Sequence, residues 1–259
     1  MKTYLRYVAI GDSTTEGLDD PDGKGSYRGW ANRFAESVAA QQRETLMYAN
    51  LAVRGLRTRQ ILDSQLERAL AMRPDLSTVV SGTNDVLRSK FDVDVFGRDV
   101  EHMQRALIDQ GATVLTFTLP DLSAIMPTAR FVADRVLRMN QMVRDVSATT
   151  GAVVVDLAAH KVASDARCWS VDRLHANSLG HARIGAALAH AIALPGSDAR
   201  WADSLPPAPR KSALQITREN WDWTRAYLWP WVLRRVRGQS SGDGVVCKRP
   251  ELEPVRIES

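Results

Sequence analysis

The chain has 259 residues, of which 44% are hydrophobic and 25% charged, an ordinary composition for a folded globular protein. Its formal net charge is +4, and no window approaches the roughly 18 to 20 consecutive apolar residues needed to cross a bilayer. The cysteines, Cys168 and Cys247, lie far apart and have neither disulfide-framework nor zinc-ligand spacing. These features exclude collagenous, disulfide-rich and integral membrane proteins. Reduced thiols without a recognisable export signal favour a cytoplasmic protein.

Short apolar runs rich in β-branched residues alternate with longer segments of helical period. This alternation predicts an α/β fold, with a parallel sheet covered by helices on both faces. The predicted strands cover residues 4–10, 45–51, 76–81, 113–118 and 152–156.

Three helices have clear sequence signals between and after these strands. Thr58 is the expected N-cap of the first, Gly151 should end the second, and Asn177 should cap the third. The third helix is predicted over residues 178–192, and the side chains expected to face inward are Leu179, Ile184, Leu188 and Ile192.

Composition changes after the third helix, which divides the chain into two predicted parts. Residues 1–195 form the expected catalytic domain, and residues 196–259 an appended segment with a proline-rich linker at 205–209 and a loose polar end. Four of the seven tryptophans lie within residues 221–231.

The appended segment contains a basic amphipathic stretch, residues 210–237, with seven basic and two acidic side chains. Trp221, Leu228, Val232 and Val236 roughly share one helical face, interrupted near Pro230. We expect this face to dock on the protein's own domain or on a second subunit. Peripheral contact with an anionic membrane and binding to an acidic partner are the alternatives, and no nucleic acid partner is expected.

The turn after the first predicted strand, Gly11-Asp12-Ser13, presents a serine at the carboxyl end of the sheet, where ligands of open α/β folds bind. It lacks the spacing of a Walker loop, and Thr15 stands where the nucleophile elbow of an α/β-hydrolase has glycine. This turn alone leaves a catalytic serine and a phosphate-binding or plain connecting loop as alternatives.

Three further turns contribute candidate residues. Gly55 lets a backbone N–H approach a ligand, and Asn84 supplies an amide donor directly after the third strand. Asp172 precedes His175 by three positions, a spacing that lets the carboxylate fix the tautomer of the imidazole.

Together these four blocks resemble the SGNH hydrolases, also called GDSL-type lipases and esterases, over about residues 1–195. The resemblance implies a three-layer α/β/α sandwich with a five-stranded parallel sheet of flavodoxin-like topology. It implies Ser13 as nucleophile, His175 as general base and Asp172 as its orienting carboxylate. The implied oxyanion hole consists of the Ser13 and Gly55 N–H groups and the Asn84 side chain. Thr14 and Ala176 depart from the usual leucine and proline but replace no group that handles protons.

The remaining polar candidates have other expected roles. His160, which follows the fifth strand, is the main competitor of His175, whereas His102, His181 and His190 fall within helices. Asp12 and Asp85 are expected to hold their turns by backbone hydrogen bonds. The acidic residues Asp19, Asp20 and Asp22 suggest a solvated loop, and we expect neither a metal nor a cofactor.

The predicted function is hydrolysis of small-molecule carboxylic esters, with short-chain or acetyl esters favoured. An acyltransferase using the same triad, a lysophospholipase or a thioesterase are the alternatives within this chemistry. A non-enzymatic binding module on the same scaffold is a third class, which the complete Ser, Gly, Asn and His set disfavours.

Overall fold

A computed structural model describes residues 2–88, 90–123, 125–209, 212–230, 233 and 241–256. A central sheet has the strand order β5-β4-β3-β1-β2-β6. The strands are β1 (Arg6–Gly11), β2 (Met47–Asn50), β3 (Leu76–Val80), β4 (Thr113–Phe117), β5 (Val153–Val155) and β6 (Arg249–Pro254). Strands β1 to β5 are parallel, in the order that defines a flavodoxin-like sheet. Five strands therefore form where the sequence predicts them.

The prediction of a five-stranded sheet with a loose polar end was wrong in one respect. The last described residues form β6, which pairs antiparallel with β2 and makes the sheet six-stranded. Val255 N–H also donates to Leu46 O at 2.9 Å, just beyond the pairing. Periodicity gives no signal here, because β6 has two prolines and no buried residue; its stability comes from the free edge of β2.

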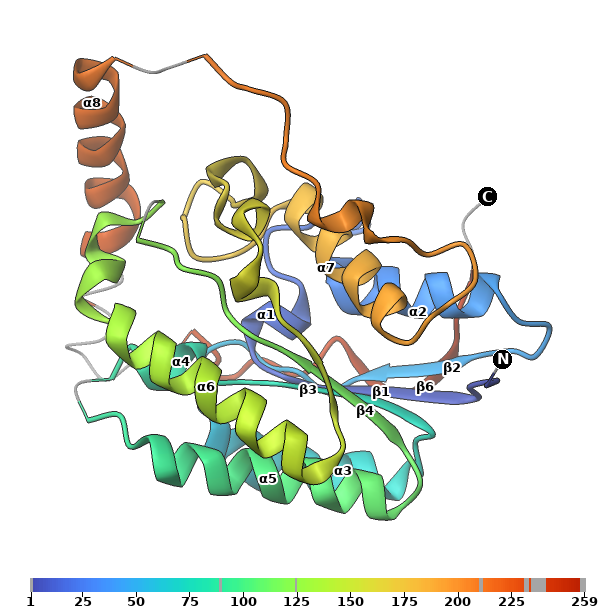
Figure 1. Cartoon of the computed structure of the whole chain (residues 1–259). Helices are drawn as coiled ribbons and strands as arrows, with labels where there is room; N and C mark the ends of the chain where they lie inside the picture. The colour runs from blue at the N-terminus through green and yellow to red at the C-terminus, as the bar shows by residue number, and fades with distance from the viewer. Residues whose placement is uncertain are drawn as a thin grey trace.

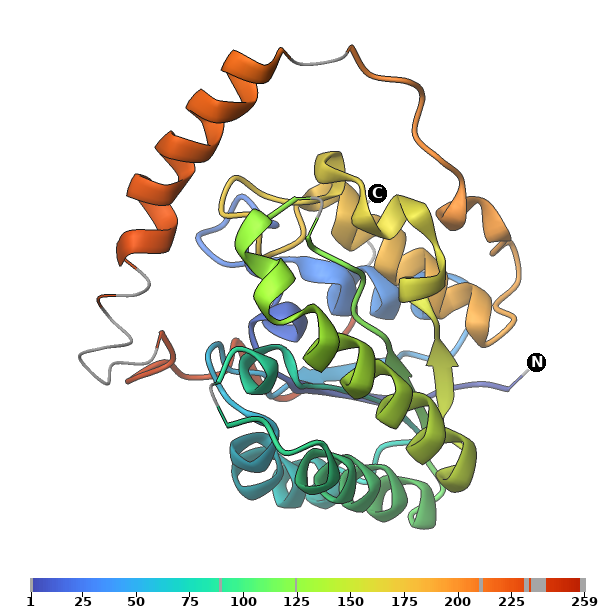
Figure 2. The ribbon, with the colours of Figure 1, turned by 60° about the vertical axis from the view of Figure 1, so that its left-hand side comes forward.

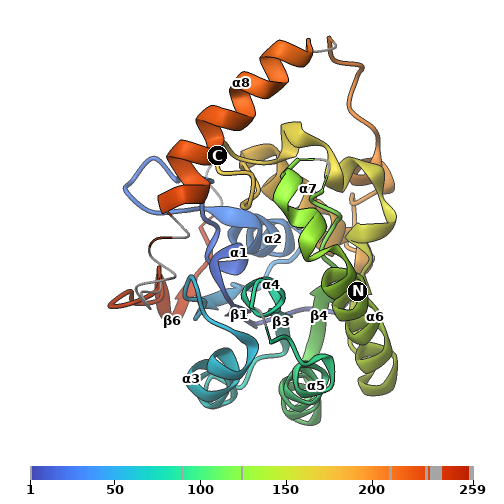
Figure 3. The same ribbon diagram turned by 90° about the vertical axis from the view of Figure 1, so that its left-hand side faces the viewer.

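Helices cover both faces of the sheet and give the three layers seen in Figures 1 and 3. One face is covered by helices α3, α5 and α6, and the other by helices α2 and α7. The helix bounds are α1 (Ser13–Glu16), α2 (Gly29–Ala40), α3 (Thr58–Ala71), α4 (Thr83–Val86), α5 (Val93–Asp109), α6 (Ala133–Thr150), α7 (Ser178–Ala191) and α8 (Ala213–Trp223). None of the described helices combines the length and apolar character needed to cross a membrane.

Two of the three predicted helix boundaries are confirmed, and one is wrong by one residue. Gly151 ends α6 with a left-handed φ of 87°, and the Asn177 side chain caps α7 by accepting from Leu179 and Gly180 N–H, both as expected. Thr58 is instead the first residue of α3, whose N-cap is Arg57. Leu179 is 41% exposed, because it lies in the first turn of α7, beyond the sheet that buries Leu188.

The segment after α7 crosses the top of the molecule. An extended connection leads to α8, which stands apart from the two helical layers in Figure 2. A π-helical turn, η6 (Thr224–Leu228), continues α8. Pro230 lies two residues beyond this turn and has no N–H for a helical hydrogen bond, a cause of such local distortion.

Candidate active site

The turn between β1 and α1 presents Ser13 at the carboxyl end of the central strand. Asp12 caps α1, because its Oδ1 accepts from Thr14 N–H at 3.0 Å, and Ser13 is the first helical residue. A Cβ at Gly11 would lie 2.6 Å from Val80 O, so glycine is required for the close approach of β1 and β3. Burial raises the pKa of Asp12 to about 6. The turn therefore fixes the serine by backbone geometry.

Ser13, His175 and Asp172 are brought together in one hydrogen-bonded line. Ser13 Oγ lies 2.9 Å from His175 Nε2, and His175 Nδ1 lies 2.6 Å from Asp172 Oδ2. The other carboxylate oxygen of Asp172 accepts from the N–H groups of Leu174 and His175, at 2.9 and 3.0 Å. The four-residue turn thus folds the carboxylate back onto the imidazole and leaves Nε2 facing the serine.

The charges around His175 favour a protonated imidazole. Burial lowers the pKa of His175. The hydrogen bond with Asp172 and the negative charges of Asp172 and Asp19 raise it by more than burial lowers it, so the net effect is an increase. Burial raises the pKa of Asp172, yet the contacts with His175 lower it to about 2. Asp172 is therefore ionised at neutral pH, and His175 is a stronger base than a free imidazole.

Asp19 contributes to this site although the sequence predicts a solvated loop for it. Its Oδ2 lies 4.0 Å from His175 Nδ1 and accepts a hydrogen bond from Ser170 Oγ. Ser170 also donates to Asp172. No local sequence pattern could reveal this, because Asp19 and Ser170 are 151 positions apart. The expected solvated loop does describe Asp22, which accepts from Lys24 and Ser26 N–H.

The proposed oxyanion donors face the same cavity as Ser13. Gly55 has a left-handed φ of 78°, which disfavours any residue with a side chain. Within the described residues, neither the Ser13 nor the Gly55 N–H donates to a protein acceptor. Asn84 Nδ2 donates to Leu56 O at 3.0 Å and to Asp12 Oδ2 at 3.2 Å. The Ser13 and Gly55 N–H groups are thus free of protein acceptors among the described residues. The hydrogen bonds to Leu56 O and Asp12 Oδ2 hold the Asn84 side chain in place.

Glu16 supports the Gly55 loop from below. Its carboxylate forms an ion pair with the Arg54 side chain and accepts from Arg54 N–H at 2.9 Å. Gly242 packs against the other side, so closely that a Cβ there would lie 2.1 Å from Arg54 O. The chain before β6 therefore braces a loop that carries a proposed oxyanion donor.

Asp85 holds its turn as the sequence predicts. Its Oδ2 accepts from the N–H and the hydroxyl of Thr58, at 3.0 and 2.9 Å. This contact joins the Asn84 turn to the start of α3, so the two loops that follow β2 and β3 have a fixed relative position.

The other histidines do not contact Ser13. The ring of His160 packs edge-on against Trp201, with ring centroids 4.6 Å apart. His102 and His190 are exposed on α5 and α7. The competitor of His175 therefore has a packing contact of its own.

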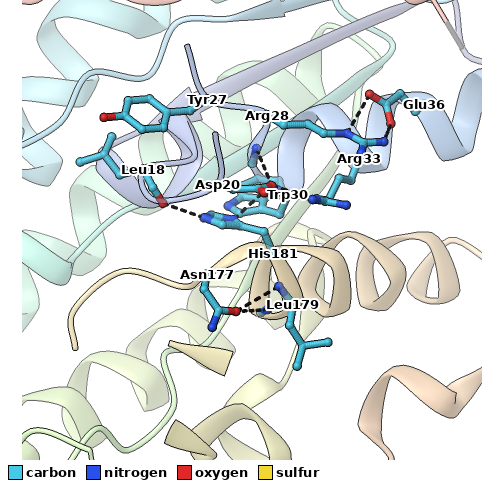
Figure 4. Close-up of polar contacts among 12 residues, drawn as sticks. Leu18, Asp20, Tyr27, Arg28, Trp30, Arg33, Glu36, Asn177, Leu179 and His181 are labelled. Atoms are coloured by element: carbon cyan, nitrogen blue, oxygen red, sulfur yellow. Dashed lines mark hydrogen bonds and ion pairs between the residues drawn. The ribbon is translucent and has the colours of Figure 1, made fainter. Parts of the chain in front are cut away.

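His181 is buried in a structural network, shown in Figure 4. Its Nε2 contacts Leu18 O at 3.0 Å, and its Nδ1 accepts from Trp30 N–H at 3.1 Å. Burial lowers its pKa to about 4, so the ring is neutral. Asp20 lies beside it, paired with Arg33 and accepting from Gly29 N–H at 3.0 Å. This network fixes the loop after α1 to α2 and α7.

Among the described residues, one group offers ligand atoms close enough together for a cation. Asp19, Asp172 and His175 each present one such atom, all within 4.8 Å of one another. The Nδ1 of His175 and Asp172 already form the 2.6 Å hydrogen bond with each other. The arrangement therefore fits an orienting pair for a base better than a metal centre.

A cavity of about 450 Å³ opens over Ser13 and His175. Its floor is built from the turns described above, and one wall is formed by Met126, Ala129 and Val132. The lining also includes Trp223, Tyr227 and Leu228, from the segment predicted to lie outside the catalytic domain. The sequence prediction for that segment chose Trp221 as a buried residue, but Trp221 is 62% exposed and Trp223 is 7% exposed. Val232 and Val236 lie outside the described residues.

Comparisons with known proteins agree with this architecture. In solved structures, the chain resembles Axe2, an acetylxylan esterase from Geobacillus stearothermophilus, with a TM-score of 0.62 and 17% identity, covering 78% of this chain and 97% of that one. It also resembles a lipase/acylhydrolase from Enterococcus faecalis, with a TM-score of 0.60 and 21% identity, covering 73% and 95%. At these identities the likeness establishes the fold.

Two sequence comparisons match the chain over different lengths. The match to a single protein is short, and the match to a family profile covers most of the chain. A protein of Bacillus subtilis (strain 168), the uncharacterized protein YpmR, is 38% identical over 63 residues, a match that spans 24% of this chain and 23% of that protein. The profile of the GDSL-like Lipase/Acylhydrolase family matches residues 9–183, which include all four motif blocks. The chain therefore belongs to the GDSL-like lipase/acylhydrolase family and is a hydrolase that acts on esters.

Proposed function

We propose that the protein hydrolyses small-molecule carboxylic esters through an acyl-enzyme on Ser13. The observation that carries this proposal is the line of hydrogen bonds from Ser13 Oγ through the His175 ring to Asp172, with distances of 2.9 and 2.6 Å. A serine hydroxyl is a weak nucleophile at neutral pH and needs an adjacent base. The chain has that base, already oriented, in the cavity that Ser13 also lines.

In the first step Ser13 Oγ bonds to the ester carbonyl carbon while its proton passes to His175 Nε2. Asp172 stabilises the imidazolium that forms. The imidazolium then gives its proton to the leaving alcohol as the ester C–O bond breaks. In the second step His175 Nε2 takes a proton from water, whose oxygen bonds to the acyl carbon. The bond between the acyl carbon and Ser13 Oγ then breaks, the imidazolium returns the proton to Ser13 Oγ, and the acid is released.

The negative charge that develops on the carbonyl oxygen is met by the Ser13 and Gly55 N–H groups and by Asn84. The first two are free to donate. Asn84 joins them by sharing the hydrogen that it directs at Asp12, whose acceptor lies at the longer distance of 3.2 Å. Fixed donors of this kind stabilise the transition state more than the ground state. The proposed mechanism needs no metal or cofactor.

The experiment is an ester-hydrolysis screen of the purified protein over acyl lengths, with Ser13→Ala as control. We expect hydrolysis by the wild-type protein and loss of nearly all activity in the variant, because removal of a triad member leaves only oxyanion-hole and binding contributions. Undiminished hydrolysis by Ser13→Ala would overturn the proposal. The preference for short-chain or acetyl esters stays a sequence prediction that the same screen tests. The cytoplasmic location also stays a prediction, supported by two buried free cysteines.

A further inference from the structure

The end of α8 contacts the turn that carries Asp172 and His175, although α8 falls outside the residues matched by the family profile. Trp223 is 7% exposed, and its indole N–H donates to Asp172 O at 2.9 Å. The contact joins the backbone of the proposed triad directly to α8. A side chain fixed in this way has a defined position relative to Ser13 and His175.

Arg173 fastens the same helix end from the other side. It stands between Asp172 and His175 in the sequence and has a left-handed φ of 61°, unusual for a residue with a side chain. Its guanidinium donates to Asn220 Oδ1 at 2.6 Å and to Ile125 O at 3.3 Å, and lies 5.1 Å from the centre of the Trp223 ring. Arg173 therefore ties α8 to the catalytic loop and to the segment before η1 (Pro127–Phe131).

The cavity surface provided by this helix end is apolar. Trp223 packs in one cluster with Met126 and Ala129, and Leu122 and Leu228 lie against it. Arg54 lines the cavity on the side of the Gly55 loop, where Glu16 neutralises its charge. An apolar chain gains free energy by leaving water for such a surface, whereas a hydroxyl-rich group would bury polar atoms without partners.

From these contacts we propose that the α8–η6 segment is a specificity wall, defined by Trp223, Tyr227 and Leu228. It makes the enzyme selective for esters that carry an apolar chain of several carbons, longer than an acetyl group, in contrast to the short-chain preference predicted from the sequence. The chain that lies on this wall belongs to the acyl group or to the alcohol of the ester. This inference rests on the proposed ester hydrolysis at Ser13, and Trp223 is its main specificity-determining residue.

The experiment measures kcat/KM along two substrate series. The first varies the acyl chain, from p-nitrophenyl acetate to p-nitrophenyl decanoate, and the second varies the alcohol, from methyl to octyl acetate. For the wild-type protein we expect kcat/KM to rise with chain length in one series, by up to about fourfold for each methylene that is fully buried. The series that rises identifies the part of the ester that contacts the wall.

Two variants test the wall itself, and a third serves as the matched control. In Trp223→Ala and in Leu228→Asn, the ratio of kcat/KM for the eight-carbon substrate to that for the shortest should fall by about tenfold or more. A ratio is insensitive to a general loss of triad geometry, which would lower both values alike. Trp221→Ala removes a tryptophan two positions away that is 62% exposed, and should leave the ratio unchanged.

The outcomes separate this inference from the function on which it depends. If the wild-type protein hydrolyses esters in a Ser13-dependent way but the ratio is unchanged in both wall variants, the wall is overturned and the esterase proposal stands. A ratio that falls equally in Trp221→Ala would also overturn it. Hydrolysis that persists in Ser13→Ala would instead overturn the proposed function.

Discussion

Outside the motif residues, Asp19 is the residue whose negative charge most raises the pKa of His175. Its Oδ2 lies 4.0 Å from His175 Nδ1, and its side chain is 37% exposed. Its charge raises the pKa of the imidazole, by less than Asp172 does. The base must be neutral to accept the Ser13 proton. Activity is therefore present above the pKa of His175 and is lost as the pH falls through it.

We predict that Asp19→Asn moves the acidic limb of the kcat/KM profile to lower pH. The substitution removes a negative charge that favours the imidazolium, so the imidazole stays neutral further into the acidic range. The size of the shift is limited, because solvent screens a partly exposed carboxylate. Asp22→Asn, in the same loop but bonded to Lys24 and Ser26 N–H, is the control. A limb that stays in place, or moves to higher pH, would contradict this electrostatic role.

Asn84 tests the oxyanion assignment at a single side chain. Asn84→Ala should lower kcat by about 10²- to 10³-fold with little change in KM, since its amide is proposed to bind the oxyanion more strongly than the ground-state carbonyl. Asn84 also donates to Leu56 O, so the melting temperature should be measured with the kinetics. A change confined to KM would assign Asn84 to substrate positioning instead.

The proximity of the proposed catalytic residues was predictable from sequence, because each of them lies in a turn at the same edge of the sheet. Asp172 and His175 share one turn, and Ser13, Gly55 and Asn84 each follow a strand, so strand order alone brings them to one edge of the sheet. Trp223 was not predictable. Its partner Asp172 is 51 positions away, and the helical pattern placed Trp221 instead on the apolar face.

At the scale of elements, the parallel strands were predictable and β6 was not. Strands β1, β3 and β4 lie inside the sheet and are rich in apolar and β-branched residues, because helices cover both of their faces. β6 lies at the edge, and its six residues are half-buried or exposed. A strand held mainly by backbone pairing to β2 leaves no side-chain pattern to read.

The C-terminal segment is predicted to stabilise the fold. Deletion of residues 206–259 should lower the melting temperature, because it removes the partner of the β2 edge, the buried Cys247 and the Trp223 contacts. Large apolar side chains contribute roughly 1.5 to 3 kcal/mol each when fully buried. The expectation that this segment docks on the protein's own domain leads to the same result.

The membrane alternative predicts a different pattern for the same truncation. An unchanged melting temperature together with lost co-sedimentation with anionic liposomes would contradict the docking role. The basic residues of 210–237 would then act at a lipid surface. Both measurements on both proteins therefore decide between the two roles.

At the level of the whole molecule, the division into residues 1–195 and 196–259 remains a proposal, and contacts cross it at several places. Lys248 Nζ donates to Tyr27 O and Arg28 O, at 2.8 and 2.9 Å, and β6 extends the sheet. The proposed catalytic groups lie in the first part, while the second part completes the cavity wall and braces the Gly55 loop. Sequence analysis separated the parts because composition changes at the linker, and composition carries no information on such contacts.

Ser13 is the proposed nucleophile, and every other role proposed for the site depends on it. Treating the intact protein with a fluorophosphonate probe, followed by mass analysis of the labelled peptide, tests it most directly. We expect one adduct on Ser13, no labelling in Ser13→Ala, and much slower labelling in His175→Ala, because the hydroxyl then has no base to take its proton. An adduct on another residue, or labelling that persists in Ser13→Ala, would contradict it.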